Sequence, residues 1–256
     1  MKISTLIIGY NRPQYLSQVL NSLSLIEPSE VFISIDSPKE NDEDLAKVQE
    51  SIKLAQYYFH NNKHLNFEST KLGCKGHVLK ALDWVLNKAQ HDFILVLEDD
   101  ILLLDKTGPR IEEFIANYKI EEPSVLKLND YFWGWVCHKS VLSQLLCNLD
   151  EYINEYTECY YNPGKLREFN IKYNSIFKNV NNVVITLEPL KAGIYFPWDE
   201  HLDLIMKFKG IKELKDVNKY VENIGLESSR DMSVESEYYG AARLRFYVEN
   251  GTPIYF

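Results

Sequence analysis

The stretch Phe93-Ile-Leu-Val-Leu-Glu-Asp-Asp-Ile-Leu-Leu-Leu104 decides how this chain is interpreted. Three consecutive carboxylates, Glu98, Asp99 and Asp100, interrupt an apolar run that is typical of a buried strand. A buried carboxylate without a partner is costly, or it shifts its pKa and becomes neutral. A divalent cation at the end of a strand would explain the triplet, and hard oxygen ligands favour Mg²⁺ or Mn²⁺. The alternative is a solvated acidic turn after an edge strand.

Strand-like and helix-like segments alternate on the amino-terminal side of this stretch. The predicted segments, in chain order, are a strand at 3–8, a helix beginning at Pro13, a strand at 31–35, a helix at 45–57, a short strand within 66–70 and a helix from the glycine loop Gly73-Cys-Lys-Gly76 to Ala89. Such alternation predicts an open α/β sheet with parallel strands and right-handed crossovers.

Polar residues follow three of the predicted strands. They are Tyr10-Asn-Arg12, Asp36 and the acidic triplet. Because ligands of open α/β sheets bind at the carboxyl ends of the strands, we expect these tips to converge on one site.

Past residue 110 the pattern becomes irregular and aromatic. Trp133 and Trp135 fit either a core or a sugar platform, and Gly134 between them would let a ligand approach the backbone. Phe196-Pro-Trp-Asp-Glu200 predicts the start of a helix, where Asp199 suits the amino end as a capping residue. Residues 238–256 fit either a closing strand packed on the core or contact with an anionic membrane surface.

Composition narrows the functional classes. The chain has 256 residues, 45% of them hydrophobic, and we expect one domain because no linker or repeat divides it. A formal net charge of -9 argues against binding to nucleic acid. There is neither a signal-peptide pattern nor a run of about 18 apolar residues, so a cytoplasmic protein is expected. The four cysteines show no C-x-x-C pair and are interpreted as reduced thiols.

Several of these segments resemble nucleotide-sugar glycosyltransferases of the GT-A fold, especially the inverting N-acetylglucosaminyltransferase I type and bacterial family 2-like relatives. The segments that carry the resemblance, in the family's order, are Ile7-Ile-Gly-Tyr-Asn-Arg-Pro13, Ser34-Ile-Asp-Ser37, Leu97-Glu-Asp-Asp-Ile101, Phe132-Trp-Gly-Trp135, Trp198-Asp-Glu200 and Asn223-Ile-Gly225. The resemblance implies a Rossmann-like, mixed, mainly parallel sheet flanked by helices. It also implies one domain over 1–256, with a nucleotide-binding half at 1–104 and an acceptor-binding half at 105–256.

The resemblance implies a role for individual positions. Asp100 would be the direct ligand of Mn²⁺ (or Mg²⁺), and Asp199 would be the general base, with Glu200 as the alternative. The remaining donor contacts would be Gly9, Asn11 and Arg12 in the nucleotide loop, Asp36 on N3 of uracil, Asp99 on the ribose or donor sugar, Glu98, Gly134 and Trp135 at the sugar, and Lys75 at a phosphate. Lys75 fits equally a turn at a helix entry, since its glycine loop matches no phosphate-loop signature. His201 is the last histidine, so diphosphate and water would fill most of the metal's coordination sphere.

These roles predict a metal-dependent, inverting glycosyltransferase that uses a UDP-sugar. A metal would neutralise the departing diphosphate, while a carboxylate would take the proton of the acceptor hydroxyl. The acceptor would be a glycan or a lipid-linked glycan, with peripheral association at the inner face of the membrane. Two alternatives stay open: a catalytically silent protein that binds nucleotide sugars or glycans, and a nucleotidyltransferase. The latter would normally show a glycine-rich, basic loop after its first strand.

Overall fold

The computed structural model of the protein describes residues 1–58, 63–129, 132–147, 183–184, 198–215, 219–225 and 247–248. The chain divides into two compact units, each of which is described by itself. The first unit comprises Met1–Leu146 with Lys209–Gly225, and the second comprises Cys147–Phe208 with Leu226–Phe256.

The first unit alternates strands and helices along most of its length. Its elements are β1 (Ser4–Gly9), α1 (Pro13–Ser22), η1 (Leu23–Leu25), β2 (Glu30–Ile35), α2 (Asp42–Tyr58), β3 (Lys63–Phe67), α3 (Gly73–Lys88), β4 (Phe93–Glu98), β5 (Ile101–Leu103), α4 (Thr107–Asn117), β6 (Ser124–Lys127), β7 (Gly134–His138), α5 (Lys139–Cys147), β9 (Lys212–Leu214) and β10 (Val221–Asn223). The described elements of the second unit are β8 (Val183–Val184), α8 (Trp198–Lys209) and β11 (Tyr247–Val248), of which β8 and β11 pair antiparallel.

Seven strands form one mixed sheet in the order β3-β2-β1-β4-β7-β6-β9. Strands β3, β2, β1 and β4 are mutually parallel, whereas β7 runs antiparallel to both β4 and β6. Strand β9 is parallel to β6. The predicted α/β architecture, a mixed and mainly parallel sheet flanked by helices, is therefore confirmed.

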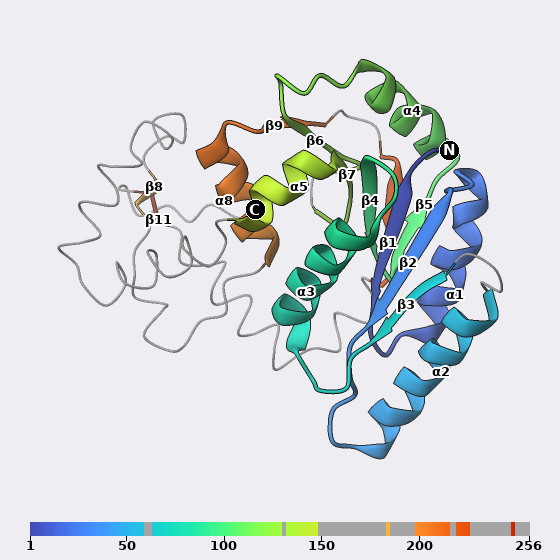
Figure 1. Ribbon diagram of the computed structural model, residues 1–256. Coiled ribbons are helices and arrows are strands. Elements are labelled where there is room, and N and C mark those ends of the chain that lie inside the picture. Colours follow the sequence, from blue (N-terminus) through green and yellow to red (C-terminus); the bar gives the residue numbers. More distant parts are fainter. Residues whose placement is uncertain are drawn as a thin grey trace. The chain divides into compact units, whose positions relative to one another are not determined.

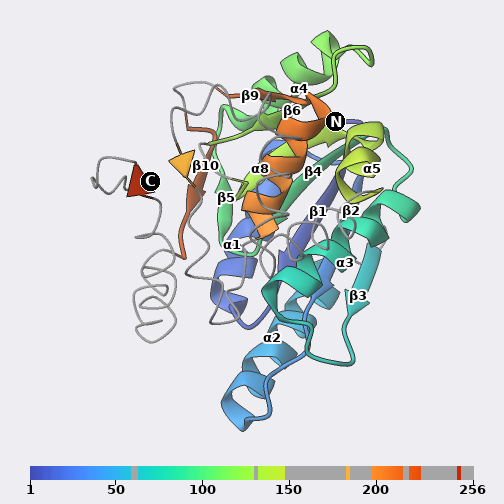
Figure 2. The same cartoon turned by 90° about the vertical axis from the view of Figure 1, so that its left-hand side faces the viewer.

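Helices cover both faces of this sheet. Helices α1 and α2 lie on one face and α3 on the opposite face, as Figure 1 shows; in the view of Figure 2, α3 lies in front of the strands. Pro13 stands in the first turn of α1, where its missing N–H costs nothing. The apolar stripe of α1, with Leu16 and Val19, packs into one core with Ile7 of β1.

A turn divides the acidic stretch at 93–104. Strand β4 ends at Glu98, Asp99 and Asp100 form the turn, and Ile101 begins β5. Strand β5 pairs antiparallel with β10 in a separate two-stranded sheet. The apolar residues on the two sides of the triplet therefore belong to different sheets.

Regular elements continue past residue 110, where the sequence pattern is irregular and predicted none of them before residue 147. Helices α4 and α5 and strands β6 and β7 fill most of 107–147. The two strands are short and buried on both faces, so they lack the alternation of polar and apolar residues that reveals a strand. The main sheet thus continues well beyond residue 104, where the nucleotide-binding half was expected to end.

Other predictions are met in part. Helix α8 begins at Trp198 as expected, and Leu202 and Ile205 are buried. Cys74 and Cys137 are free thiols, whereas Cys159 lies outside the described residues. Most of the predicted closing strand lies outside them too, although Val248 is part of β11. None of the described helices has both the length and the apolar character needed to cross a membrane.

Candidate functional site

The polar tips of β1 and β4 meet at the carboxyl edge of the main sheet. These strands lie side by side, with Ile8 opposite Glu98. The backbone N–H of Asp99 donates to the carbonyl of Ile8 over 2.9 Å, and the N–H of Tyr10 donates to Oδ2 of Asp99 over 2.8 Å. The chain crosses from β3 back past β1 to β4, which makes the β1–β4 boundary the topological switch point where ligands of such sheets bind.

Arg12 joins the two aspartates of the triplet. Its guanidinium donates to Oδ2 of Asp100 over 2.5 Å and to Oδ1 of Asp99. Burial alone would lower the pKa of Arg12, but the charges of Asp99 and Asp100 outweigh it and raise that pKa, so the side chain stays cationic. The sequence suggested Arg12 as a nucleotide contact and contained no sign that it would bridge these carboxylates.

Asp100 retains one unused acceptor. Its Oδ1 is buried and has no hydrogen-bond partner among the described residues. Burial raises the pKa of Asp100, and the neighbouring charge of Asp99 raises it further, while Arg12 opposes both. A buried carboxylate oxygen without a partner, beside the Oδ2 that Arg12 already binds, is a position that a further cation would stabilise.

Gly225 holds the other side of Asp100. The N–H of Ile224 donates to the backbone carbonyl of Asp100 over 2.9 Å. A Cβ added at Gly225 would lie 2.9 Å from Cγ of Asp100 and would overlap its carboxylate. The resemblance marked 223–225 only as a late strand end, and the structure explains why a glycine stands there.

We expect Gly225→Ala to lower the free energy of unfolding by about 1–3 kcal/mol, because the added methyl group must displace the Asp100 carboxylate. Urea denaturation measures this. Gly76→Ala is the matched control, since a Cβ there meets only the Cβ of Leu72, at 3.5 Å, on the exposed side of α3. That change should instead add about 0.5–1 kcal/mol. Equal losses in both variants would contradict this account of Gly225.

The donor atoms suit Mn²⁺ or Mg²⁺ held through one carboxylate. The free Oδ1 of Asp100 is a hard oxygen ligand, and such ions commonly bind through one or two carboxylates plus phosphate and water. Among the described residues, no group of three or more His, Cys, Asp or Glu side chains could hold an ion by itself. Asp100 therefore fits a metal that arrives with a phosphorylated ligand better than it fits a permanent metal site.

Asp36, at the end of β2, is buried and fully engaged. Its Oδ1 accepts from the N–H of Ser37 over 2.8 Å and of Leu72 over 3.0 Å. Its Oδ2 accepts from the N–H of Gly73 over 3.1 Å and pairs with Nζ of Lys71 at 2.9 Å. The carboxylate thus caps the start of α3, a role that the sequence analysis did not anticipate.

The loop after β1 is held by Asp44 from the first turn of α2. Asp44 accepts from the phenol of Tyr10, from Nδ2 of Asn11 over 2.5 Å and from the N–H of Lys39 over 2.5 Å. Burial alone would raise the pKa of Asp44, but the hydrogen bonds outweigh it and lower the pKa. The sequence shows three acids in this turn, and nothing in the pattern distinguishes Asp44 from the other two.

The aromatic segment belongs to the core. Trp135 is fully buried and packs edge-on against Phe132, with ring centroids 5.4 Å apart. A Cβ added at Gly134 would meet side chains of Leu97 and Val221 at 3.3 Å, so close packing of the strands accounts for this glycine. Contact of Gly134 and Trp135 with a sugar stays a prediction.

The remaining candidates take separate places. Glu98 ends β4 and is half-buried, and Gly9 ends β1 with Asp99 beside it. Lys75 is half-buried in the first turn of α3, where burial lowers its pKa. Asp199 and Glu200 lie in the first turn of α8, which belongs to the second unit, and Asp199 is half-buried. That Asp199 or Glu200 approaches Asp99 and Asp100, which together form the aspartate cluster after β4, stays a prediction.

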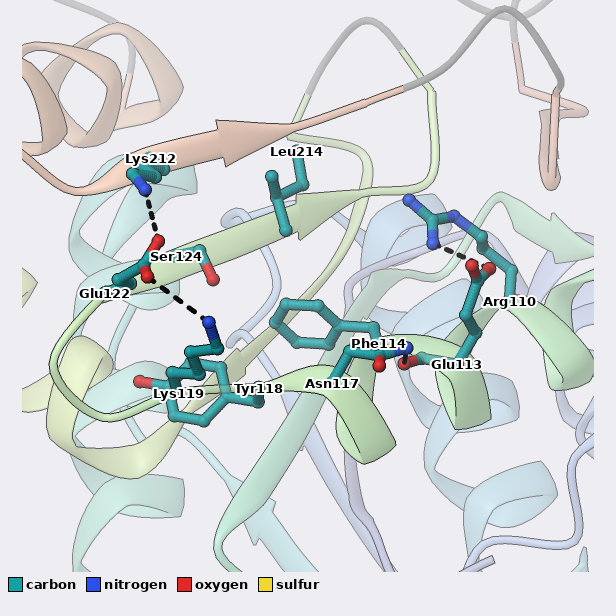
Figure 3. A pocket seen from close by; sticks show the side chains of 10 residues that line it. All are labelled: Arg110, Glu113, Phe114, Asn117, Tyr118, Lys119, Glu122, Ser124, Lys212 and Leu214. Atoms are coloured by element: carbon teal, nitrogen blue, oxygen red, sulfur yellow. Dashed lines mark hydrogen bonds and ion pairs between the residues drawn. The ribbon is translucent and has the colours of Figure 1, made fainter.

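A cavity of about 280 Å³ lies elsewhere in the first unit. It is formed between α4, Ser124 at the start of β6 and Lys212 at the start of β9, and Figure 3 shows the ring of Phe114 among its lining side chains. Strands β6 and β9 run in the same direction as β4, so their starts lie at the amino edge of the sheet. This cavity is therefore at the edge opposite the aspartate cluster.

No protein-family model matches the chain, and no curated protein matches it. Among solved structures, S. aureus TarS is similar at 24% identity and a TM-score of 0.35, over 49% of this chain and 21% of that one. Its fragment 1-349 is similar at 16% identity and a TM-score of 0.44, over 97% of this chain and 67% of the fragment. The mannosyltransferase PcManGT from Pyrobaculum calidifontis was solved in complex with GDP-Man and Mn²⁺. It is similar at 12% identity and a TM-score of 0.41, over 56% of this chain and 46% of the mannosyltransferase.

These likenesses are limited. All three TM-scores lie below 0.5, so none of them supports a fold or a function by itself. The chain also spans only about a fifth of TarS and less than half of the mannosyltransferase.

Proposed function

We propose that this chain is a metal-dependent, inverting glycosyltransferase. It would move a sugar from a nucleoside diphosphate donor, for which we propose a UDP-sugar, to a glycan or lipid-linked acceptor. One observation carries the proposal: Asp36, Arg12 and the Asp99–Asp100 pair gather at the carboxyl edge of the sheet, next to its switch point. A nucleotide bound there would have the carboxylate of Asp36 near its base. Its diphosphate would lie near the guanidinium of Arg12 and the free Oδ1 of Asp100.

The diphosphate end of this site rests on Arg12 and Asp100. The planar guanidinium of Arg12 suits phosphate oxygens, and Asp99 with Asp100 keeps it charged and in place. The free Oδ1 of Asp100 would hold Mn²⁺ or Mg²⁺, and the ion would supply Lewis-acid stabilisation of the negative charge on the departing diphosphate. Asp99 would contact the ribose or donor sugar, and Glu98 would face the sugar.

Transfer also needs a base on the acceptor side. Asp199, or Glu200 beside it, would take the proton of an acceptor hydroxyl as that oxygen bonds to the anomeric carbon. The bond from this carbon to the diphosphate oxygen breaks in the same step, so the configuration inverts and the nucleoside diphosphate leaves. Both carboxylates stand at the amino end of α8, where the helix dipole favours their ionised form.

Thermal unfolding against nucleoside diphosphates and their sugars, each with Mn²⁺ and with a chelator, tests the donor site. A specific ligand at about 100 times its dissociation constant should add about 2.7 kcal/mol to the free energy of unfolding. We expect the largest stabilisation with uridine nucleotides and its loss on chelation. No stabilisation by any nucleotide would overturn the proposal, whereas binding without sugar transfer would indicate a silent nucleotide-sugar-binding protein.

A further inference from the structure

One ammonium group contacts both surfaces that would hold a nucleobase. Nζ of Lys71 lies 2.9 Å from Oδ2 of Asp36 and 3.1 Å from the centroid of the Tyr10 ring. A base that stacked on Tyr10 while donating an N–H to Asp36 would need this same position. Lys71 and such a base therefore exclude one another.

The other bonds of Asp36 are of a different kind. Its further donors in the described part of the chain are the backbone N–H groups of Ser37, Leu72 and Gly73. These bonds hold the turn after β2 and the start of α3 and can persist when a ligand binds. Lys71 reaches Asp36 through a flexible, partly exposed side chain, so it can leave without disturbing the backbone.

Tyr10 is fixed as a platform. Its phenol donates to Asp44, and its backbone N–H donates to Asp99, so the two ends of the residue are tied to helix α2 and to the turn after β4. The ring face under Lys71 is thereby held next to Asp36 whether or not Lys71 is present. An aromatic face beside a carboxylate attracts a cation or a flat ring that carries an N–H group.

We propose that Lys71 is a resident occupant of the base end of the donor site, that nucleotide binding displaces it, and that this exchange sets the affinity for the donor, while Asp36 selects the base. The inference rests on the proposed function and adds a residue to it. A base can hydrogen-bond to Asp36 in this way only if its edge carries an N–H at the matching position, as N3–H of uracil and N1–H of guanine do. Cytosine presents an acceptor at that nitrogen, so it leaves Asp36 better paired with Lys71.

Lys71→Met tests the exchange, because methionine keeps most of the length of the unbranched side chain and removes the ammonium group and its charge. If Lys71 occupies the site in about nine of ten free molecules, its removal should lower the Kd for UDP with Mn²⁺ about tenfold. Isothermal titration measures this. Lys47→Met is the matched control, since Lys47 also pairs with a carboxylate, Glu43 at 2.7 Å, on the exposed surface of α2. It should leave the Kd unchanged.

Comparison of UDP with CDP gives the selectivity. Lys71→Met should lower the Kd for CDP by the same factor as that for UDP, because both bases displace Lys71, and the preference for UDP should be kept, because only uracil has an N–H for Asp36. An unchanged or higher Kd for UDP in Lys71→Met, with binding intact in the unmodified protein, would overturn the role of Lys71 and leave the donor site standing. Absence of nucleotide binding in both proteins would instead overturn the proposed function.

A spectroscopic measurement separates displacement from a merely structural contact. Lysines can be reductively methylated with ¹³C, which keeps their charge, and the Lys71 signal is the one missing from Lys71→Met. The Tyr10 ring should shift this signal upfield in the free protein, since Nζ lies over the ring face. UDP should return it to the range of the other lysines. A signal that stays upfield at saturating UDP would contradict the exchange.

Discussion

Asp100→Asn is expected to lower the rate of sugar transfer by about 10²–10³-fold, the usual effect of removing one electrostatic stabiliser of a developing charge. The physical reason is the free Oδ1, which asparagine replaces with a neutral amide that binds Mn²⁺ or Mg²⁺ poorly. The same variant should lose most of the Mn²⁺-dependent part of UDP binding. Steady-state kinetics and titration of Mn²⁺ in the presence of UDP measure the two effects.

Asp105→Asn is the control for this variant, because Asp105 is an exposed aspartate a few residues farther along the chain. It should change neither quantity. Thermal unfolding of Asp100→Asn shows whether the fold is kept, since Arg12 retains its bond to Asp99. A folded Asp100→Asn protein with unaltered metal dependence would remove Asp100 as the metal ligand.

Loss of the catalytic base should produce the other large effect. We expect either Asp199→Asn or Glu200→Gln to lower kcat by about 10²–10⁴-fold, because the acceptor hydroxyl then keeps its proton as it attacks. The Kd for the donor should stay nearly constant, since these residues face the acceptor in the proposed mechanism. Single-turnover transfer and nucleotide titration separate chemistry from binding.

The two substitutions identify the base between them. The variant with the large loss marks the base, and the other should retain most of the activity. Asp203→Asn, one turn farther along α8, is the matched control for a carboxylate on the same helix. Full activity in both Asp199→Asn and Glu200→Gln would contradict the mechanism, whereas a matching rise in donor Kd would indicate a structural role at the helix start.

The sites of greatest consequence carried clear signals in the sequence. The triplet at 98–100 combines apolar flanks with adjacent charges, so its place at the end of a strand followed from the cost of burying charge. Pro13 and the apolar spacing after it predicted α1 for an equally local reason. Strands β6 and β7 were missed because a short strand buried on both faces shows no period along the chain.

The sequence by itself determined the alternation of strands and helices up to β4 and the presence of carboxylates at the strand ends. Both depend on neighbours in the chain, through hydrophobic periodicity and turn residues. Only the tertiary structure decided which partners those carboxylates have. Arg12 pairs with Asp99 and Asp100, and Gly225 packs against Asp100. Lys71 pairs with Asp36 and also lies over the Tyr10 ring. These pairs join residues from 35 to 125 positions apart, and burial at the edge of the sheet selects them, so no local pattern could have identified them.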